Sequence, residues 1–132
     1  MPGAASSPLR VFVRETLGCT CPDAVFEVVE RTEELSPVSR VAFTRWVIGR
    51  RLLIYLVQPP APAEIVGELA ALGRQDRDSR GLNRFRLALV SAPGEMDAQG
   101  AERAFAAVAG EDPKAHLHRV AAERCAGVLA DG

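Results

Sequence analysis

Two cysteines stand one residue apart in the segment ETLGCTCPDAVF, which covers residues 15–26. Gly18 and Pro22 flank the pair and predict a loop that leads into a helix, so both sulfurs can turn toward one point. The unpaired N–H groups and the positive dipole end at a helix N-terminus favour thiolate over thiol. Cys19 and Cys21 are therefore the residues best placed to do chemistry.

Three interpretations of Cys19 and Cys21 stay open. Two thiolates can hold a soft ion such as Cu(I), whereas Zn requires four donors and hence further ligands from this chain or a second subunit. The same pair can cycle between dithiol and disulfide, because a Cys-x-Cys disulfide closes a small, strained ring that is easily reduced. In the third interpretation both residues fill a turn without chemistry.

Carboxylates of the first predicted helix are the next candidates for chemistry. Asp23, Glu27 and Glu30 stand in or near its early turns, where acidic residues complement the helix dipole and face solvent. We interpret them in this way rather than as catalytic groups. The sequence contains no catalytic triad, phosphate-binding glycine loop or metalloprotease helix, so we do not expect an enzyme.

The third cysteine and both histidines belong to the predicted C-terminal helical region. Cys125 is expected to pack in the core. In a helix His118 would lie two turns before Cys125 on nearly the same side, while His116 would project elsewhere. We expect these histidines to be ordinary helix residues rather than metal ligands.

The composition indicates one globular domain. The chain has 132 residues, of which 48% are hydrophobic and 25% are charged. Its net charge of -1 provides no bulk attraction for nucleic acid or an anionic membrane, so neither is an expected partner. Three cysteines are a sparse, odd set, which predicts a cytoplasmic protein with reduced thiols. Residues 1–8 are predicted to form a disordered leader before a domain over residues 9–132.

The first half of the chain predicts three strands and a helix. Alternation over residues 9–17 favours a strand, and residues 21–35 favour a helix. Residues 40–48 and 51–58 then predict two strands joined by a tight turn at Gly49.

The second half predicts a helix that begins at Pro62 and ends at Gly73. Its apolar face carries Ile65, Val66, Leu69 and Leu72. A charged loop over residues 74–81, a strand over residues 82–92 and a turn over residues 93–100 follow. The remaining alanine-rich segment predicts helix with a break near residues 110–113.

The element order is β-α-β-β-α-β, followed by helix. This order predicts an α+β, ferredoxin-like fold, in which a four-stranded antiparallel sheet carries two helices on one face. Residues 9–91 would form the core and residues 95–130 a C-terminal helical extension. The most apolar strand, residues 51–58, would then be central.

The second face of this sheet also needs a cover. We expect Phe12, Trp46 and Tyr55 to pack there, against the C-terminal helices or a second subunit, and we favour a homodimer to which the tail contributes. Arg45 is expected to join Arg50 and Arg51 in an exposed basic rim around the hairpin, which blocks edge-to-edge pairing.

The cysteine loop and the element order together resemble the heavy-metal-associated domains of copper chaperones and metal-transporting ATPases. The loop of that family reads Gly-Met-Thr-Cys-x-x-Cys. Gly18, Thr20 and Cys21 match it here, while Cys19 stands at the methionine and Ala24 at the second cysteine. The likeness covers the topology of residues 9–91 and this loop. It implies that Cys19 and Cys21 would carry the metal.

Two functions follow as expectations. The first is a thiol-based binding module, in which Cys19 and Cys21 hold a soft metal ion or act as a redox switch. The second is a non-catalytic, homodimeric structural or ligand-binding protein of ferredoxin-like fold, in which the cysteines are incidental.

Overall fold

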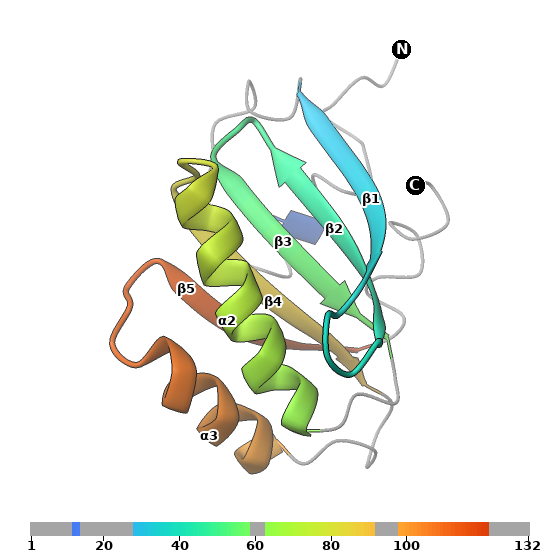
Figure 1. Cartoon of the computed structure of the whole chain (residues 1–132), viewed down its shortest axis with the longest axis vertical. Helices are drawn as coiled ribbons and strands as arrows, with labels where there is room; N and C mark the ends of the chain where they lie inside the picture. Colours follow the sequence, from blue (N-terminus) through green and yellow to red (C-terminus); the bar gives the residue numbers. More distant parts are fainter. Residues whose placement is uncertain (1–11, 14–27, 59–62, 92–97, 122–132) are drawn as a thin grey trace.

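The computed structural model describes residues 12–13, 28–58, 63–91 and 98–121 (Figure 1). Its elements in chain order are β1 (Val29–Leu35), β2 (Ala42–Ile48), β3 (Leu52–Val57), α2 (Ala63–Ser79), β4 (Arg84–Ser91), α3 (Ala98–Ala109) and β5 (Ala115–Ala121). The strands form one sheet in the order β1-β2-β3-β4-β5. Antiparallel pairing joins β1, β2 and β3, and parallel pairing joins β3, β4 and β5. The predicted α+β class is confirmed, but the sheet is five-stranded and mixed instead of four-stranded and antiparallel.

Both described helices lie on the same face of the sheet (Figure 1). The helix α2 connects β3 to its parallel neighbour β4, and α3 connects β4 to its parallel neighbour β5. Crossovers of this kind are almost always right-handed. Because both advance in the same direction along the sheet, they place both helices on one side.

The predicted hairpin between β2 and β3 is confirmed. Its turn closes with a hydrogen bond of 3.1 Å from the Arg51 N–H to the Ile48 carbonyl. Gly49 and Arg50 both have positive φ, at 62° and 57°, which is the conformation that matches the twist of antiparallel strands. The central position predicted for the most apolar strand is also confirmed, since β3 is the third of five strands.

The strand β1 corrects the predicted helix over residues 21–35. Residues 29–35 pair antiparallel with β2, from Val29 opposite Ile48 to Leu35 opposite Ala42. The strand lies at the sheet edge and is largely exposed, so its sequence lacks the clean alternation of a half-buried strand. Charged side chains along β1 discourage pairing with another chain.

The helix α2 begins at Ala63 and continues through Ser79, so the predicted end at Gly73 and the predicted charged loop are wrong. The helix ends where Gly81 adopts a φ of 68°. The Leu82 N–H then bonds the Arg77 carbonyl at 2.8 Å, and the Gly81 N–H bonds the Asp78 carbonyl at 3.3 Å. This pair of bonds is a Schellman cap, which satisfies carbonyls of the last turn.

The C-terminal region contains a strand where helix was predicted. The predicted break is present, with a turn after α3 at Gly110, but residues 115–121 form β5 and extend the sheet. They pair with β4 from Ala115 opposite Phe85 to Ala121 opposite Ser91. Pairing with β4 satisfies backbone groups that a helix would satisfy internally, so tertiary context decides this segment.

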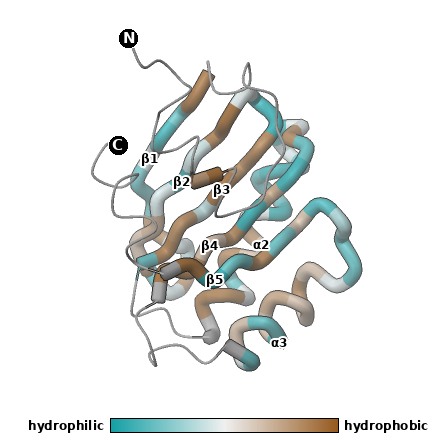
Figure 2. Tube along the Cα trace, turned by 180° about the vertical axis from the view of Figure 1, so that it is seen from behind, coloured by the Kyte–Doolittle hydropathy of each residue, from teal (hydrophilic) through white to brown (hydrophobic). Residues whose placement is uncertain are grey.

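Apolar side chains fill both faces of the sheet. The core between the sheet and the helices is built around buried residues such as Leu53, Tyr55, Leu69, Phe85, Leu87 and Phe105. The opposite face carries a second cluster of Phe12, Val13, Trp46, Ile48, Leu52, Ile54, Leu56, Ala88, Val90 and Val120. In the hydropathy view, β3 is brown along most of its length and β1 is largely teal (Figure 2).

The aromatic residues predicted for the second face divide between the two clusters. Phe12 and Trp46 lie there as expected, and Phe12 and Val13 form part of its cover in a helical turn, not in the predicted strand. Tyr55 instead faces the helices, because it alternates with Ile54 along β3. The predicted homodimer stays a prediction.

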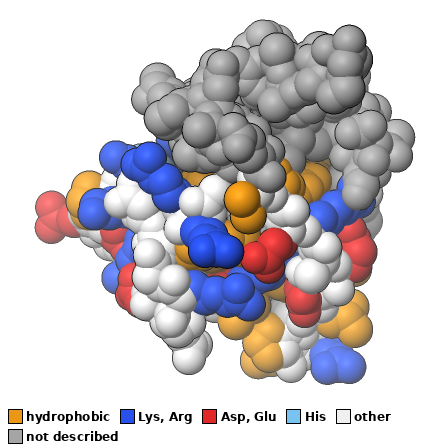
Figure 3. All heavy atoms as spheres, turned by 90° about the horizontal axis from the view of Figure 1, so that it is seen from above, with side chains coloured by type: hydrophobic (Ala, Val, Ile, Leu, Met, Phe, Trp, Pro, Cys, Tyr) orange, Lys and Arg blue, Asp and Glu red, His pale blue; other side chains and the backbone are white. Residues whose placement is uncertain are grey.

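Charged side chains of both signs lie beside one another on the face seen in Figure 3. Among the described residues seen in that view, no large area carries charge of only one sign. Within the part of the chain that the structure describes, neither helix combines the length and the apolar character needed to cross a bilayer.

Candidate binding pocket between α2 and the β1–β2 strands

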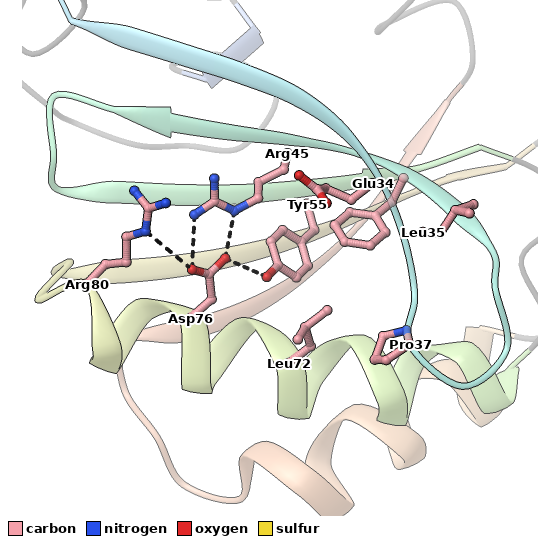
Figure 4. A pocket seen from close by; sticks show the side chains of 9 residues that line it. Glu34, Leu35, Pro37, Arg45, Tyr55, Leu72, Asp76 and Arg80 are labelled. Carbon is pink, nitrogen blue, oxygen red and sulfur yellow. Dashed lines mark hydrogen bonds and ion pairs between the residues drawn. The ribbon is translucent and has the colours of Figure 1, made fainter.

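An open pocket lies between α2 and the end of the sheet formed by β1, β2 and β3 (Figure 4). Its volume is about 380 Å³. The lining residues are Glu34, Leu35, Pro37, Phe43, Arg45, Tyr55, Leu72, Asp76 and Arg80. Four of these are apolar and five are polar, so the pocket can contact both the apolar and the polar parts of a small molecule.

A hydrogen-bonded triad forms the polar wall of the pocket. The Asp76 carboxylate accepts hydrogen bonds from Arg45 Nε at 2.7 Å and from Arg45 Nη2 at 3.0 Å. The Tyr55 hydroxyl donates a third bond of 2.7 Å to the same carboxylate. The two-pronged contact between the guanidinium and the carboxylate fixes both planes, and such charge-assisted bonds are stronger than neutral ones.

Three elements position this triad. Arg45 of β2 and Tyr55 of β3 are cross-strand partners, so their side chains emerge side by side toward α2. The ring of Tyr55 packs between Phe43 and Phe85, with centroid separations of 4.6 Å and 5.0 Å. This packing fixes the hydroxyl where Asp76 of α2 accepts its hydrogen bond.

The protonation state of each triad residue is fixed near neutral pH by the shifts of the three pKa values. Burial would raise the pKa of Asp76, but the hydrogen bonds from Arg45 and Tyr55 outweigh it and the pKa is lowered. Burial and the bond to Asp76 raise the pKa of Tyr55. The pKa of Arg45 is raised chiefly by its hydrogen bond to Asp76. Near neutral pH the three groups are therefore phenol, carboxylate and guanidinium, and they do not exchange protons.

The apolar wall comes from β1, β2, α2 and the β1–β2 loop, through Leu35, Phe43, Leu72 and Pro37. Glu68 of α2 fixes the loop.

The carboxylate of Glu68 accepts hydrogen bonds from two loop amides. Val38 N–H bonds Oε2 at 2.6 Å, and Ser39 N–H bonds Oε1 at 3.1 Å. Arg40 in the same loop has a positive φ of 59°, and its N–H bonds the Ser36 carbonyl at 3.1 Å. The loop that carries Pro37 is thus tied to α2 by hydrogen bonds from its backbone amides to the Glu68 side chain.

Two guanidinium groups of the pocket lining keep donors outside the triad. Within the described residues, Arg45 Nη1 has no hydrogen-bond acceptor, because Asp76 engages only Nε and Nη2. Arg80 Nε lies 4.0 Å from Asp76 Oδ1, and its side chain is 50% exposed. Figure 4 shows the guanidinium groups of Arg45 and Arg80 beside each other, both directed toward Asp76. The positive charges of Arg45 and Arg80 are balanced by the negative charges of Asp76 and Glu34, so the pocket lining has no net charge.

The burial of Arg45 corrects one prediction. The sequence suggested that Arg45 joins Arg50 and Arg51 in an exposed rim. Arg50 and Arg51 are indeed exposed, but the Arg45 side chain is only 10% exposed and lies under α2.

Sequence reasoning missed Asp76 because it placed this residue in a loop. The available signal was the spacing of Leu69, Leu72 and Asp76, which puts all three on one face when the helix continues past Gly73.

The predicted thiol site lies outside the described residues. This holds for Cys19, Cys21 and Cys125, and also for Asp23 and Glu27. The binding of Cu(I) or Zn and the redox role therefore stay predictions. Among residues 12–13, 28–58, 63–91 and 98–121, no group of three His, Cys, Asp or Glu side chains could hold a metal ion.

Two predicted placements outside the pocket are wrong. Glu30 lies on the exposed edge strand β1 rather than on a helix. His116 and His118 lie on β5, where a spacing of two residues directs both side chains to the same face of the sheet. The two-turn relation expected between His118 and Cys125 required a helix at His118, and Cys125 itself lies outside the described residues.

Comparison of the chain with known protein families, with curated proteins and with solved structures found no match.

Proposed function

We propose that this protein is a small-molecule-binding module and that the pocket between α2 and the β1–β2 strands is its binding site. The ligand is a small organic molecule with an apolar body and a head group that accepts hydrogen bonds. One observation carries the proposal: in a pocket of about 380 Å³, a fixed polar wall stands next to an apolar wall. The guanidinium groups of the polar wall keep hydrogen-bond donors that the triad does not use.

Each wall of the pocket recognises a different part of the ligand. The ring of Phe43 and the side chain of Leu72 offer apolar surface whose removal from water favours binding. Arg45 Nη1 and the guanidinium of Arg80 offer donors to a carboxylate or carbonyl oxygen. Because Asp76 already neutralises Arg45, the head group does not need a full negative charge.

The state of the triad favours binding over catalysis. General acid–base catalysis requires a group that gains or loses a proton near the working pH. The pKa of Asp76 is lowered and that of Tyr55 is raised, so neither group titrates there. A rigid, already saturated triad instead orients the remaining donors before the ligand arrives.

The test is a titration with small carboxylic acids, for which we choose benzoate and cyclohexanecarboxylate, followed by amide NMR shifts. We expect saturable shifts around Tyr55, Leu72 and Asp76. Leu72→Trp should fill the pocket and abolish these shifts. Arg80→Gln should weaken binding by about tenfold through the loss of a charge-assisted hydrogen bond.

The matched control is Ala71→Trp, which adds the same side chain at the adjacent exposed position of α2. This variant should bind as the unmodified protein does. The proposal is wrong if neither acid gives saturable shifts, or if Leu72→Trp and Ala71→Trp bind equally well.

The thiol-based function remains a separate proposal. Its support is the sequence of the loop around Cys19 and Cys21. Thiol titration beside elemental analysis, after purification without chelators, tests it. Fast labelling of two thiols that bound metal suppresses, and that Cys19→Ser or Cys21→Ser removes, would support a metal site. Three slow, equivalent thiols without metal would exclude it.

The homodimer is likewise a proposal and rests on the sequence alone, because the apolar side chains of the second sheet face are already buried within the single chain. Sedimentation equilibrium gives the mass directly, and a monomer at all concentrations would contradict it.

A further inference from the structure

Four nitrogen-rich side chains gather at one end of the sheet face that lies opposite the helices. Arg84 and Arg86 come from β4, and His116 and His118 come from the neighbouring strand β5. Residues two apart on a strand share a face, so each strand contributes both of its side chains to the same side. In the parallel register Arg86 lies opposite His116.

The arginines and histidines are connected in pairs. Arg84 Nη1 lies 3.3 Å from His116 Nε2, and Arg86 Nη1 lies 2.9 Å from His118 Nε2. A guanidinium can only donate, so each imidazole accepts at Nε2 and carries its proton on Nδ1. Both histidines are thereby held neutral.

Burial and neighbouring positive charge lower the pKa values of His116, His118 and Arg86. The pKa of His118 is lowered to about 4, first by burial and then by Arg86 and His116. Burial also lowers the pKa of His116, together with Arg86 and Arg84. Arg86 itself is 9% exposed, and its pKa is lowered by burial and by Arg84.

Few other charges of the described residues face the cluster. On β3, the neighbours of the two arginines are the apolar Leu52 and Ile54. Asp112, in the connection between α3 and β5, exerts a weaker field that opposes the lowering of the pKa of His116. It is committed to ion pairs with Arg74 and Arg77.

We propose that Arg84, Arg86, His116 and His118 form a binding site for a small tetrahedral oxyanion of the sulfate or phosphate class. The guanidinium fork matches the oxygen geometry of such anions. An anion oxygen would replace His118 Nε2 as the acceptor for Arg86 Nη1. The released Nε2 could then take a proton from solvent and donate to the anion.

An anion suits this cluster better than a metal cation. A metal ion needs the Nε2 lone pair or a deprotonated nitrogen, and the arginines occupy both Nε2 atoms. A cation would also sit beside two positive charges. Arg84, His116 and His118 are partly exposed, so a small solute can reach the imidazoles from water.

Imidazole NMR gives a direct test, because the chain contains only 2 histidines and both belong to the cluster. Sulfate is the first probe, since it is the anion of a strong acid and keeps its charge over the range in which the two imidazoles titrate. Chloride is replaced by sulfate at constant ionic strength. We expect saturable shifts of both imidazoles and a rise of about one unit in the pKa of His118, which corresponds to about tenfold tighter binding to the protonated form.

Two variants and one control make the test specific. Arg86→Gln and Arg84→Gln should each weaken sulfate binding by about tenfold. Arg84 is partly exposed, so that variant keeps the test valid if Arg86→Gln does not fold. Arg119→Gln is the control, because Arg119 lies on β5 with the two histidines but is directed toward Glu102 of α3, at 3.9 Å. It should bind sulfate as the unmodified protein does.

The source of the anion is resolved by comparing inorganic phosphate with glycerol 3-phosphate. Tighter binding of the ester assigns the site to a phosphorylated metabolite, and equal or weaker binding assigns it to the free ion. The proposal is overturned if sulfate produces no saturable change beyond that of chloride, or if the Arg84→Gln and Arg86→Gln proteins bind sulfate as tightly as the unmodified protein. It is also overturned if Zn²⁺ binds the two imidazoles while sulfate does not. The pocket under α2 lies on the other sheet face, so either site can fail alone.

Discussion

Gly73 of α2 lies directly against the ring of Phe85 on β4. A Cβ atom at position 73 would overlap that ring, far inside van der Waals contact. The helix therefore continues through this glycine because the sheet packs against it, and the glycine permits close approach rather than ending the helix.

Gly73→Ala should destabilise the protein, although alanine is the better helix former by about 1 kcal/mol. The added methyl must displace Phe85, which is fully buried, and overpacking of this kind costs about 1–3 kcal/mol. Urea unfolding measures the change. Gly67→Ala in the same helix is the control, since its Cβ would meet Val108 at an ordinary 3.8 Å. We expect Gly67→Ala to stabilise by up to about 1 kcal/mol, and two changes of the same sign and size would contradict this view.

Asp76→Asn should be more damaging than Tyr55→Phe. The first change leaves the guanidinium of Arg45 without its counter-charge at 10% exposure, which costs about 3–5 kcal/mol. The second removes one hydrogen bond and costs about 1–2 kcal/mol. Chemical denaturation of both variants gives the order directly.

A triple replacement tests whether charge is the cause. Arg45→Met with Asp76→Leu removes both charges and keeps apolar volume, and Tyr55→Phe removes the hydroxyl that would otherwise lose its acceptor. This variant should recover much of the loss seen in Asp76→Asn. Stability equal to or below that of Asp76→Asn would show that the loss comes from packing instead.

Asp112 should make the stability depend on pH below about 4. Its hydrogen bond from Arg77 lowers the pKa from 3.8 to about 2, against the opposing effect of burial. A carboxyl whose pKa is lower in the folded state stabilises the fold above its unfolded pKa, and this contribution is lost as the pH falls toward 2. The full shift is worth a little over ~2 kcal/mol, and solvent screening reduces our expectation to about 1 kcal/mol.

Unfolding measured between pH 5 and 2 (roughly the range in which Asp titrates) tests this expectation. Asp112→Asn should be less stable than the unmodified protein at the upper end, and the difference should shrink toward the lower end. A difference that stays constant over the range would exclude the titration of Asp112 as its cause.

Glu68→Ala should loosen the β1–β2 loop without unfolding the sheet. Hydrogen exchange of the Val38 and Ser39 amides should accelerate, because both donate to the Glu68 carboxylate. Since Pro37 of this loop lines the pocket, binding of the probe acids should weaken by a few-fold. Glu102→Ala on α3, whose carboxylate lies 3.9 Å from Arg119, is the control and should change neither quantity. Unchanged exchange at Val38 would contradict the role assigned to Glu68.

The binding residues could be predicted only in part. The sequence identified Leu72 as part of the apolar face of α2, and the structure places it in the pocket. Arg45 and Asp76 are 31 residues apart, and no local pattern connects them. Their contact depends on how α2 crosses the sheet, and it was hidden further by the early end predicted for that helix.

Local patterns were sufficient to determine the β2–β3 hairpin, β4 and the apolar face of α2 from the sequence. In these segments the alternation or the helical spacing of apolar residues coincides with a buried face, and Gly49 marks the turn. The edge strands β1 and β5 were decided only by the tertiary structure, because their backbone bonds are made with β2 and β4. The side chains of β1 are also largely exposed, and those of β5 are only partly buried. The pocket and the cluster of Arg84, Arg86, His116 and His118 were likewise decided only by the tertiary structure. Each joins side chains from different elements, and the distances between them are set by packing and register, which no single stretch of sequence encodes.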